Sequence, residues 1–386
     1  MKFHFTIGQK GDSFMLFAYT EHGEPFMSYQ HSRQALKRYR RISKFFCPQC
    51  QQPVQLKIGT VNIPHFSHIA HQSCERLFAE GESMLHLQGK IQLFEWLNKQ
   101  GYAVELEPYI KKLSQRPDIL VTKEHQQIAI EFQCSTISHE KWQLRTAGYK
   151  NMHIQALWLF QTPQKNLTSQ DIIKVTIPPI RQNAINYTSK SLPYLLTYDA
   201  HSARFNYWAN LLYVHGNTFI AKVQYVPIKK QLFPFYVPKP ITREEFRYYW
   251  QLYKRICMQY VYQRLIRSKK GVQDLFLRSC YELHFSLETM PIYVGLPVKN
   301  AASIPIFSIE WQTILHHFCR LTQLQLHELS KENIQLFLSQ LSLQTTNEAV
   351  QAVKNYCNLF ERWSHSNDHF PDICEQVYSH FSNIND

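Results

Sequence analysis

The pattern of hydrophobic and polar positions changes its period along the chain, and each change marks an expected element. In the middle of the chain, helical spacing of apolar residues alternates with strand-like runs. In order, the pattern predicts a helix over 83–99, strands over 103–107, 118–121 and 127–132, a helix over 139–150 and a buried strand over 154–160. Ser138 stands before the second helix, where its hydroxyl can accept a backbone N–H. This order predicts an α/β domain.

The segment before this domain has a different character. Residues 2–19 alternate around a polar turn and predict a hairpin, and Ser32 can cap a short helix over 33–41. From 45 to 74 the sequence becomes polar and rich in His and Cys. We therefore expect a small β-rich module over 1–78.

The segment after the α/β domain is predicted to be mostly helical. Pro178-Pro179 is the best candidate for a domain boundary, and residues 187–240 are rich in Tyr, Phe and Pro without a clear period. Helices are predicted over 242–268, 306–326, 331–342 and 346–363, the last with a capping box of Thr345 and Glu348. The predicted domains are therefore an N-terminal module over 1–78, an α/β domain over 79–178 and an aromatic-rich, mostly helical domain over 179–386.

Composition and charge indicate a folded protein with a polyanionic partner. Hydrophobic residues make up 44% of the 386 residues and there is no repetitive tract, which excludes a disordered chain. The formal net charge of +13 favours nucleic acid, with an anionic membrane surface as the alternative. Six basic residues and no acid lie between Arg33 and Lys44. They form either a phosphate-contacting patch or a solvated helix face.

Cysteine usage and hydropathy indicate the compartment. The chain has 9 cysteines, an odd number, and five of them are scattered singly through the last 130 residues, which favours reduced thiols over a disulfide framework. No run reaches the length of a membrane span, and the opening residues lack the apolar stretch of a secretory signal. We therefore expect a cytoplasmic protein without a membrane span.

Two close pairs of metal-ligand residues lie in the N-terminal module. The C-x-x-C and H-x-x-H pairs, separated by 14 residues, are Cys47, Cys50, His65 and His68. Thiolate and imidazole together suit Zn²⁺, and a small module with little core needs such a metal for its folding. His71 and Cys74 lie close enough in sequence to replace a ligand. The alternative is a pair of free cysteines beside ordinary surface histidines.

Two carboxylates and a glutamine lie on a predicted hairpin of the α/β domain. Asp118 begins one strand, and Glu131 and Gln133 lie two residues apart on the next, so that they face the same side. Phosphodiester hydrolysis commonly uses Mg²⁺ or Mn²⁺, which two carboxylates can hold. Asp118 and Glu131 are therefore candidate ligands of a catalytic metal, and Gln133 is a candidate water-orienting group. The alternative is an isolated Asp and Glu that merely flank a turn.

The neighbouring helices carry polar rows. Glu82, His86 and Lys90 fall at positions i, i+4 and i+8, apart from the apolar stripe. They could supply a third metal contact, a proton shuttle and a phosphate clamp, or could form a solvated face with a favourable Glu-to-Lys series. Candidate DNA phosphate contacts, with the same alternative of a solvated face, are Arg116, Ser135, Lys141, Arg145 and Tyr149.

In combination these motifs resemble the competence protein CoiA family. The resemblance covers about 45–160 and rests on Glu82-Ser-x-x-His86-x-x-x-Lys90, Arg116-Pro-Asp118-Ile, Ile130-Glu131-Phe-Gln133-x-Ser135 and the Cys/His pattern of the N-terminal module. It implies a restriction-endonuclease-like central domain, the PD-(D/E)xK fold, with Asp118 and Glu131 as metal ligands. Gln133 stands where that motif usually has lysine. Lys90 or Lys141 could supply the missing positive charge; otherwise the site only holds DNA.

The resemblance further implies a role in natural transformation, after DNA uptake, with a RecA-type recombinase and strand-loading proteins as neighbours. Two functions fit the motifs: a metal-dependent deoxyribonuclease, or a non-catalytic DNA-binding adaptor that recruits recombination proteins through a degenerate nuclease fold. In the C-terminal half, Arg243 to Lys270 has eight basic residues against two Glu, interleaved with aromatic residues. This pattern fits single-stranded DNA binding, or core packing of most rings.

Overall fold

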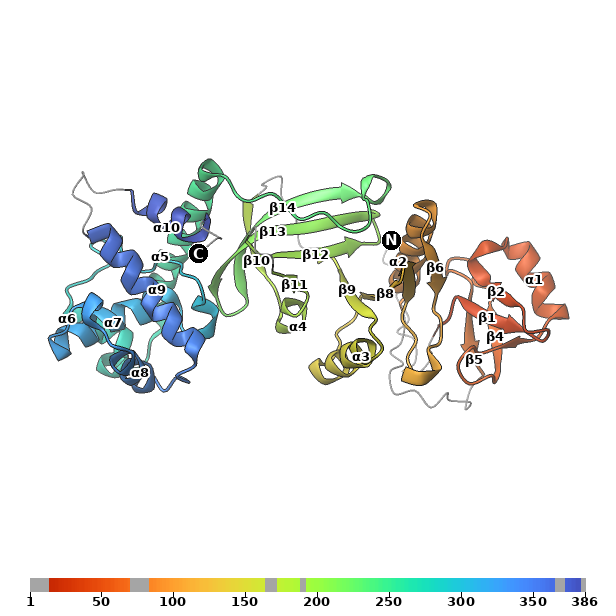
Figure 1. The fold of residues 1–386 in the computed structure, drawn as a ribbon, viewed down its shortest axis with the longest axis horizontal. Helices are drawn as coiled ribbons and strands as arrows, with labels where there is room; N and C mark the ends of the chain where they lie inside the picture. The colour runs from red at the N-terminus through yellow and green to blue at the C-terminus, as the bar shows by residue number, and fades with distance from the viewer. Residues whose placement is uncertain (1–13, 70–82, 164–171, 188–191, 365–371, 383–386) are drawn as a thin grey trace. The chain divides into compact units, whose positions relative to one another are not determined.

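The computed structural model describes residues 14–69, 83–163, 172–187, 192–364 and 372–382. It has sheets and helices (Figure 1), which confirms the predicted mixture of α and β structure. The chain forms two compact units. The first comprises Met1–Lys165, Leu196–Asn206 and Tyr225–Tyr236, and the second Asn166–Leu195, Tyr207–Gln224 and Val237–Asp386. Glu82, His71, Cys74 and residues 2–13 of the predicted hairpin lie outside the described residues. In the described ranges, no helix has both the length and the apolar character needed to cross a membrane.

The N-terminal module of the first unit is an antiparallel sheet with one helix. Its strands, in the order β2-β1-β3-β4-β5, are β1 (Phe17–Thr20), β2 (Pro25–Met27), β3 (Phe45–Phe46), β4 (Pro53–Lys57) and β5 (His65–His68). Helix α1 (Arg33–Ile42) begins after Ser32, whose hydroxyl accepts the backbone N–H of Ala35 at 3.2 Å. The predicted helix and its cap are thereby confirmed.

The rest of the first unit contains the predicted α/β elements. They are α2 (Met84–Lys99), β6 (Ala103–Leu106), β7 (Ile119–Lys123), β8 (Gln126–Gln133), α3 (His139–Asn151) and β9 (Gln155–Gln161). Strands β6, β7 and β8 are antiparallel neighbours, whereas α3 makes the crossover that lets β9 lie parallel to β8. Ser138 caps α3 by accepting the N–H of Lys141 at 3.3 Å. All six elements were predicted from the sequence pattern.

Between the predicted boundary at residue 179 and the long C-terminal helices, the structure has four strands that the sequence pattern did not reveal. They follow strand β10 (Ile172–Thr176) and the short helix α4 (Pro179–Gln182), and in chain order they are β11 (Ile185–Asn186), β12 (Tyr194–Asp199), β13 (Arg204–His215) and β14 (Thr218–Pro227). Strand β13 is buried over eight consecutive residues. Such a strand has no alternation of apolar and polar residues by which to recognise it.

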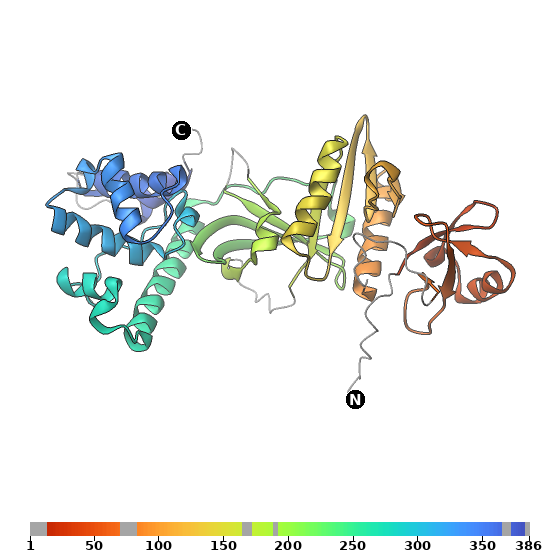
Figure 2. The ribbon, with the colours of Figure 1, turned by 90° about the horizontal axis from the view of Figure 1, so that it is seen from below.

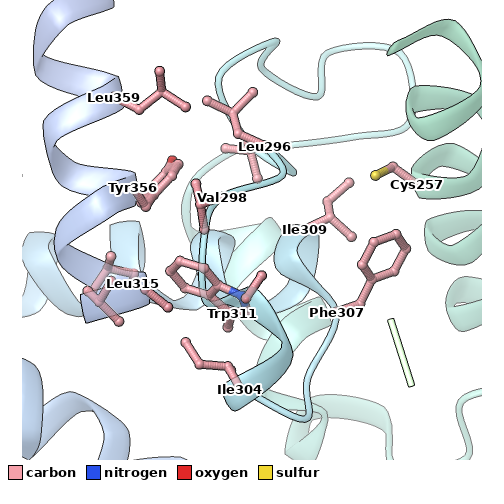
Figure 3. Close-up of a cluster of buried hydrophobic side chains, with 14 of the residues drawn as sticks. Cys257, Leu296, Val298, Ile304, Phe307, Ile309, Trp311, Leu315, Tyr356 and Leu359 are labelled. Atoms are coloured by element: carbon pink, nitrogen blue, oxygen red, sulfur yellow. The ribbon is translucent and has the colours of Figure 1, made fainter. Parts of the chain in front are cut away.

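The helices of the second unit pack around one apolar core. They are α5 (Arg243–Arg267), α6 (Leu275–Glu282), α7 (Ser308–Thr322), α8 (Lys331–Gln340), α9 (Asn347–Ser364) and α10 (Ile373–Ser382). Figure 3 shows Trp311 of α7, fully buried, beside Tyr356 of α9. The predicted helices are confirmed, but the capping box proposed for α9 is not: the cap is one residue later, and Ala349 at the third helical position cannot complete a box. Thr346, not Thr345, accepts the first backbone N–H, from Ala349 at 3.2 Å.

Candidate functional site

Helix α2 and strands β7 and β8 bring the predicted polar side chains together. Asp118 directly precedes β7, and the strand register pairs Ile119 with Ile130, next to Glu131. Helix α2 packs closely on β8 because Gly89 has no side chain: a Cβ there would lie 2.1 Å from Cε1 of Phe132. This close approach places the polar row of α2 against the start of β7.

Three groups hold the carboxylate of Asp118. Its Oδ2 lies 3.1 Å from Nε2 of His86 and accepts the backbone N–H of Phe132 at 2.8 Å, and its Oδ1 lies 3.8 Å from Nζ of Lys90. Burial alone would raise the pKa of Asp118, but His86 and Lys90 hold that pKa well below its usual value. The side chains of Asp118 and His86 keep 13% and 16% exposure, so solvent reaches this end of the site.

Glu107, which the sequence analysis did not identify, completes a buried network. It follows β6 and forms an ion pair with Lys90, whose side chain is 0% exposed against 1% for Glu107. Oε2 of Glu107 lies 3.9 Å from Nη1 of Arg116 and accepts the backbone N–H of Leu16 at 3.2 Å. Burial would raise the pKa of Glu107, but Lys90 and Arg116 lower it below its usual value. Lys90 is thus fixed beside Asp118.

The second predicted carboxylate, Glu131, faces α3. Its Oε1 accepts hydrogen bonds from Arg145 and from the hydroxyl of Tyr149. Burial raises the pKa of Glu131 above its ordinary value, and Arg145 offsets part of that effect. Arg145 also donates to the carbonyl of Arg116 at 3.1 Å. Two of the three α3 residues predicted to contact phosphate, Arg145 and Tyr149, therefore contact the candidate metal ligand.

The remaining predicted residues lie at the edge of this network. Nε2 of Gln133 donates to Ser135, to its carbonyl at 3.1 Å and to its hydroxyl at 2.9 Å. Lys141 is exposed in the first turn of α3. Of the two lysines that could replace the charge missing at Gln133, Lys90 is therefore the one that lies beside Asp118.

Asp118 and Glu131 have the hard oxygen atoms that Mg²⁺ or Mn²⁺ prefers. Three of these oxygens already face His86, Lys90 or Arg145. Among the described residues, neither carboxylate belongs to a group of three His, Cys, Asp or Glu ligand atoms within 4.8 Å of one another. The donor chemistry thus fits the predicted metal, but at least one ion pair would have to open for the ion to bind.

A second cluster lies in the N-terminal module. Cys47, Cys50 and His68 place their ligand atoms within 4.8 Å of one another, with Sγ of Cys50 3.3 Å from Nε2 of His68. Burial raises the pKa of the Cys47 thiol, but hydrogen bonding to His68 brings it below its ordinary value, which favours the thiolate. His65 lies outside this group, and its Nδ1 is 2.8 Å from the carbonyl of Ile63.

The physical reason for this difference is the strand period. His65 and His68 are three residues apart on β5, so their side chains leave opposite faces of the sheet. His65 instead lies against Phe14, with ring centroids 4.3 Å apart. The donor set of two thiols and one imidazole fits Zn²⁺. His71 and Cys74, the other ligands that the sequence offered, lie outside the described residues.

Comparisons with known proteins match two stretches of the chain. Residues 82–238 match the family described as competence protein CoiA, nuclease-like domain, and residues 28–76 match competence protein CoiA, N-terminal domain. Competence protein CoiA of Bacillus subtilis (strain 168) is 28% identical over 291 residues, which are 74% of this chain and 73% of that protein. No solved structure matches.

Proposed function

The chain belongs to the competence protein CoiA family, and we propose that it processes DNA phosphodiesters during natural transformation at the site around Asp118. Membership supports a role in competence and a nuclease-like domain. The observation that carries the proposal is the buried Lys90, 3.8 Å from Asp118, with Glu131 on the next strand. Buried charge networks beside a solvent-accessible acid are typical of functional sites.

Each residue would have a separate role. Mg²⁺ or Mn²⁺ bound by Asp118 and Glu131 would polarise the phosphate and activate a water. Lys90 would supply the fixed positive charge that Gln133 cannot carry. His86 would hold or release a proton at Nε2, and Arg116 and Lys141 would contact the DNA backbone.

A catalysis assay tests this proposal. Full-length protein is incubated with end-labelled single-stranded or duplex DNA and either metal. We expect cleavage that Asp118→Asn abolishes and that Glu348→Gln, an exposed carboxylate of α9, leaves unchanged. Cleavage that persists at the wild-type rate in Asp118→Asn would overturn the assignment of this site.

A second function is favoured by a specific observation. Asp118, Glu107 and Glu131 all have cationic partners within the chain, so the site is neutralised without a metal. A non-catalytic DNA-binding adaptor would keep this arrangement. It predicts DNA binding and a transformation frequency that survive Asp118→Asn, whereas the enzyme predicts loss of transformation with folding retained.

We place the action of the protein in the cytoplasm after DNA uptake, when single strands pass to a recombinase of the RecA type and its loading proteins. Co-purification of such proteins with the tagged chain from competent cells tests this placement. We also assign Zn²⁺ to Cys47, Cys50 and His68, because two thiols and an imidazole at this separation suit that ion. The zinc would be structural, and no reaction step depends on it.

A further inference from the structure

The C-terminal end of α5 borders a cavity of about 420 Å³ in the second unit. Its lining is mostly hydrogen-bond donors and cations: Tyr260, Gln263, Arg264, Arg267, Ser268, Lys269, Lys270 and Asp274. Arg267, Lys269 and Lys270 are exposed. From Phe246 to Gln273 the sequence has no acidic residue. The cavity is larger than a phosphate needs and is of a size to take a nucleotide.

The one acid in this lining is already neutralised. Asp274 is 1% exposed. Its Oδ2 accepts from Nε of Arg264 at 2.9 Å and from the hydroxyl of Ser268 at 2.6 Å, and its Oδ1 accepts from the backbone N–H of Leu277 at 3.3 Å. Arg264 is in addition 3.4 Å from Glu310. Arg264 is one cation between two carboxylates, Asp274 and Glu310, so one negative charge is left in this group, and the three exposed cations outnumber it.

The backbone at the C-terminal end of α5 carries a partial charge opposite in sign to those cations. A helix C-terminus carries a partial negative charge that disfavours an anion, on the order of half an elementary charge. Arg267 is in the last turn of α5, and Lys269 and Lys270 follow directly. Three full positive charges exceed that partial charge, and they also complement the helix end. The net potential of the cavity mouth is positive.

Apolar side chains lie next to the cations on α5. Tyr262, Leu265 and Ile266 are 56%, 48% and 64% exposed. At 100° per residue, Ile266 lies about 60° and Tyr262 about 100° from Gln263, so the ring of Tyr262 lies outside the cavity-lining face. The core rings of this helix, Phe246, Tyr249 and Tyr253, are in contrast buried. Two rings of α5 are thus exposed: Tyr248 near the start of the helix and Tyr262 near its C-terminal end.

We propose that this end of α5 binds single-stranded nucleic acid, with Arg267, Lys269 and Lys270 contacting phosphates and Tyr262 stacking on a base. The site is separate from the carboxylates around Asp118, and its existence does not depend on cleavage. Tyr262 lies about 100° around α5 from Gln263 and about 140° from Arg267, so a strand that contacts the cations must turn around the helix to stack on this ring, which a flexible single strand can do and a stiff duplex cannot.

Binding of full-length protein to a fluorescent dT oligonucleotide of about 12 nucleotides, measured by anisotropy across a salt series, tests the proposal. The variant combines Arg267→Gln, Lys269→Gln and Lys270→Gln. Its matched control combines Lys331→Gln, Lys354→Gln and Arg362→Gln, which removes the same charge from exposed positions of α8 and α9. Loss of three phosphate contacts should flatten the slope of log K against log salt by about 2. The control should keep the wild-type slope.

Two substitutions of Tyr262 separate base stacking from the attraction between cations and phosphates. Tyr262→Phe keeps a ring and should bind as wild type, whereas Tyr262→Leu keeps apolar area without a ring and should weaken binding at least fivefold. Equal slopes in the two triple variants, or equal affinity in Tyr262→Leu and wild type, would overturn the proposal. Binding to phosphatidylserine vesicles that the triple substitution weakens, without binding to the oligonucleotide, would overturn the proposal as well. The same measurements on the Asp118→Asn chain should give wild-type affinity, so failure of cleavage is distinguishable from failure of this site.

Discussion

The substitution Glu107→Gln tests the buried network most directly. It removes the negative charge that pairs with Lys90 while keeping the shape of the side chain. Both side chains are essentially inaccessible, so water cannot replace the lost partner. Lys90 would keep Asp118 at 3.8 Å, and Arg116 would lose its partner at 3.9 Å. Breaking one side of a buried pair typically costs about 3–5 kcal/mol of unfolding free energy.

Equilibrium unfolding in urea, with hydrogen exchange of α2 as a local probe, measures this loss. The matched control is Glu105→Gln, an exposed acid on the same strand, which should change the unfolding free energy by less than about 0.5 kcal/mol. Replacing both partners, as in Lys90→Met with Glu107→Leu, should cost less than Glu107→Gln alone, because neither charge of the fully buried pair then remains without the other. If the single variant is within about 1 kcal/mol of wild type, the buried pair does not stabilise the fold.

The dependence on pH supplies an independent check. The pKa of Glu107 is lowered in the folded chain, so its ionised form stabilises the protein above the unfolded value of 4.5. That stabilisation disappears as pH falls through the folded pKa. The difference between wild type and Glu107→Gln should therefore be full at neutral pH and shrink in acid. A difference that stays constant over this range would contradict the linkage.

Three further predictions concern other parts of the chain. Gly89→Ala should destabilise the first unit by about 1–3 kcal/mol, since its Cβ would meet the Phe132 ring at 2.1 Å, and thermal unfolding against Gly59→Ala measures it. Cys50→Ser should lower the zinc content, measured by mass spectrometry of purified protein, from one ion per chain to well below one; unchanged content would refute the ligand assignment. Burial lowers the pKa of His316 from 6.5 to about 4, so stability should fall by at most roughly 3 kcal/mol as pH drops from 6.5 to 4, because the unfolded chain binds the proton first. His316→Gln should show a flatter pH profile of unfolding over that range.

The sequence patterns predicted the helices and strands better than they predicted which side chains contact one another. The helices and strands from residue 83 to 161 were predictable because helical spacing, short apolar runs and a capping serine distinguish them from the polar turns between them. Strand β13 was not, because residues of every polarity are buried along it. Capping could be predicted to within a residue at α1 and α3, where a single serine precedes the helix.

Most residues of the site were predicted, but the contacts that they make with one another were not. The sequence placed Asp118, His86 and Lys90 together, yet it assigned Arg145 to DNA although Arg145 contacts Glu131. Glu107 was not predicted as a site residue, because an acid at the end of a strand usually reaches solvent. One signal could have found it: β6 ends where antiparallel β7 begins, so the backbone N–H of Glu107 donates to the carbonyl of Asp118 at 2.9 Å. Acids at the end of one strand and the start of its antiparallel neighbour lie side by side.

The hydrogen bond from the backbone N–H of Leu16 to Glu107 has a consequence for the folding of the chain. Leu16 is fully buried beside the sheet of the N-terminal module, next to Met15, which bridges to Phe66 of β5. Only a folded module presents that N–H at the right place. A fragment that began at residue 79 would leave Oε2 of Glu107 without this donor in a region that excludes water. The buried base of the site therefore includes Leu16, which precedes both matched segments, and it is complete only after the N-terminal module and the α/β elements have both folded.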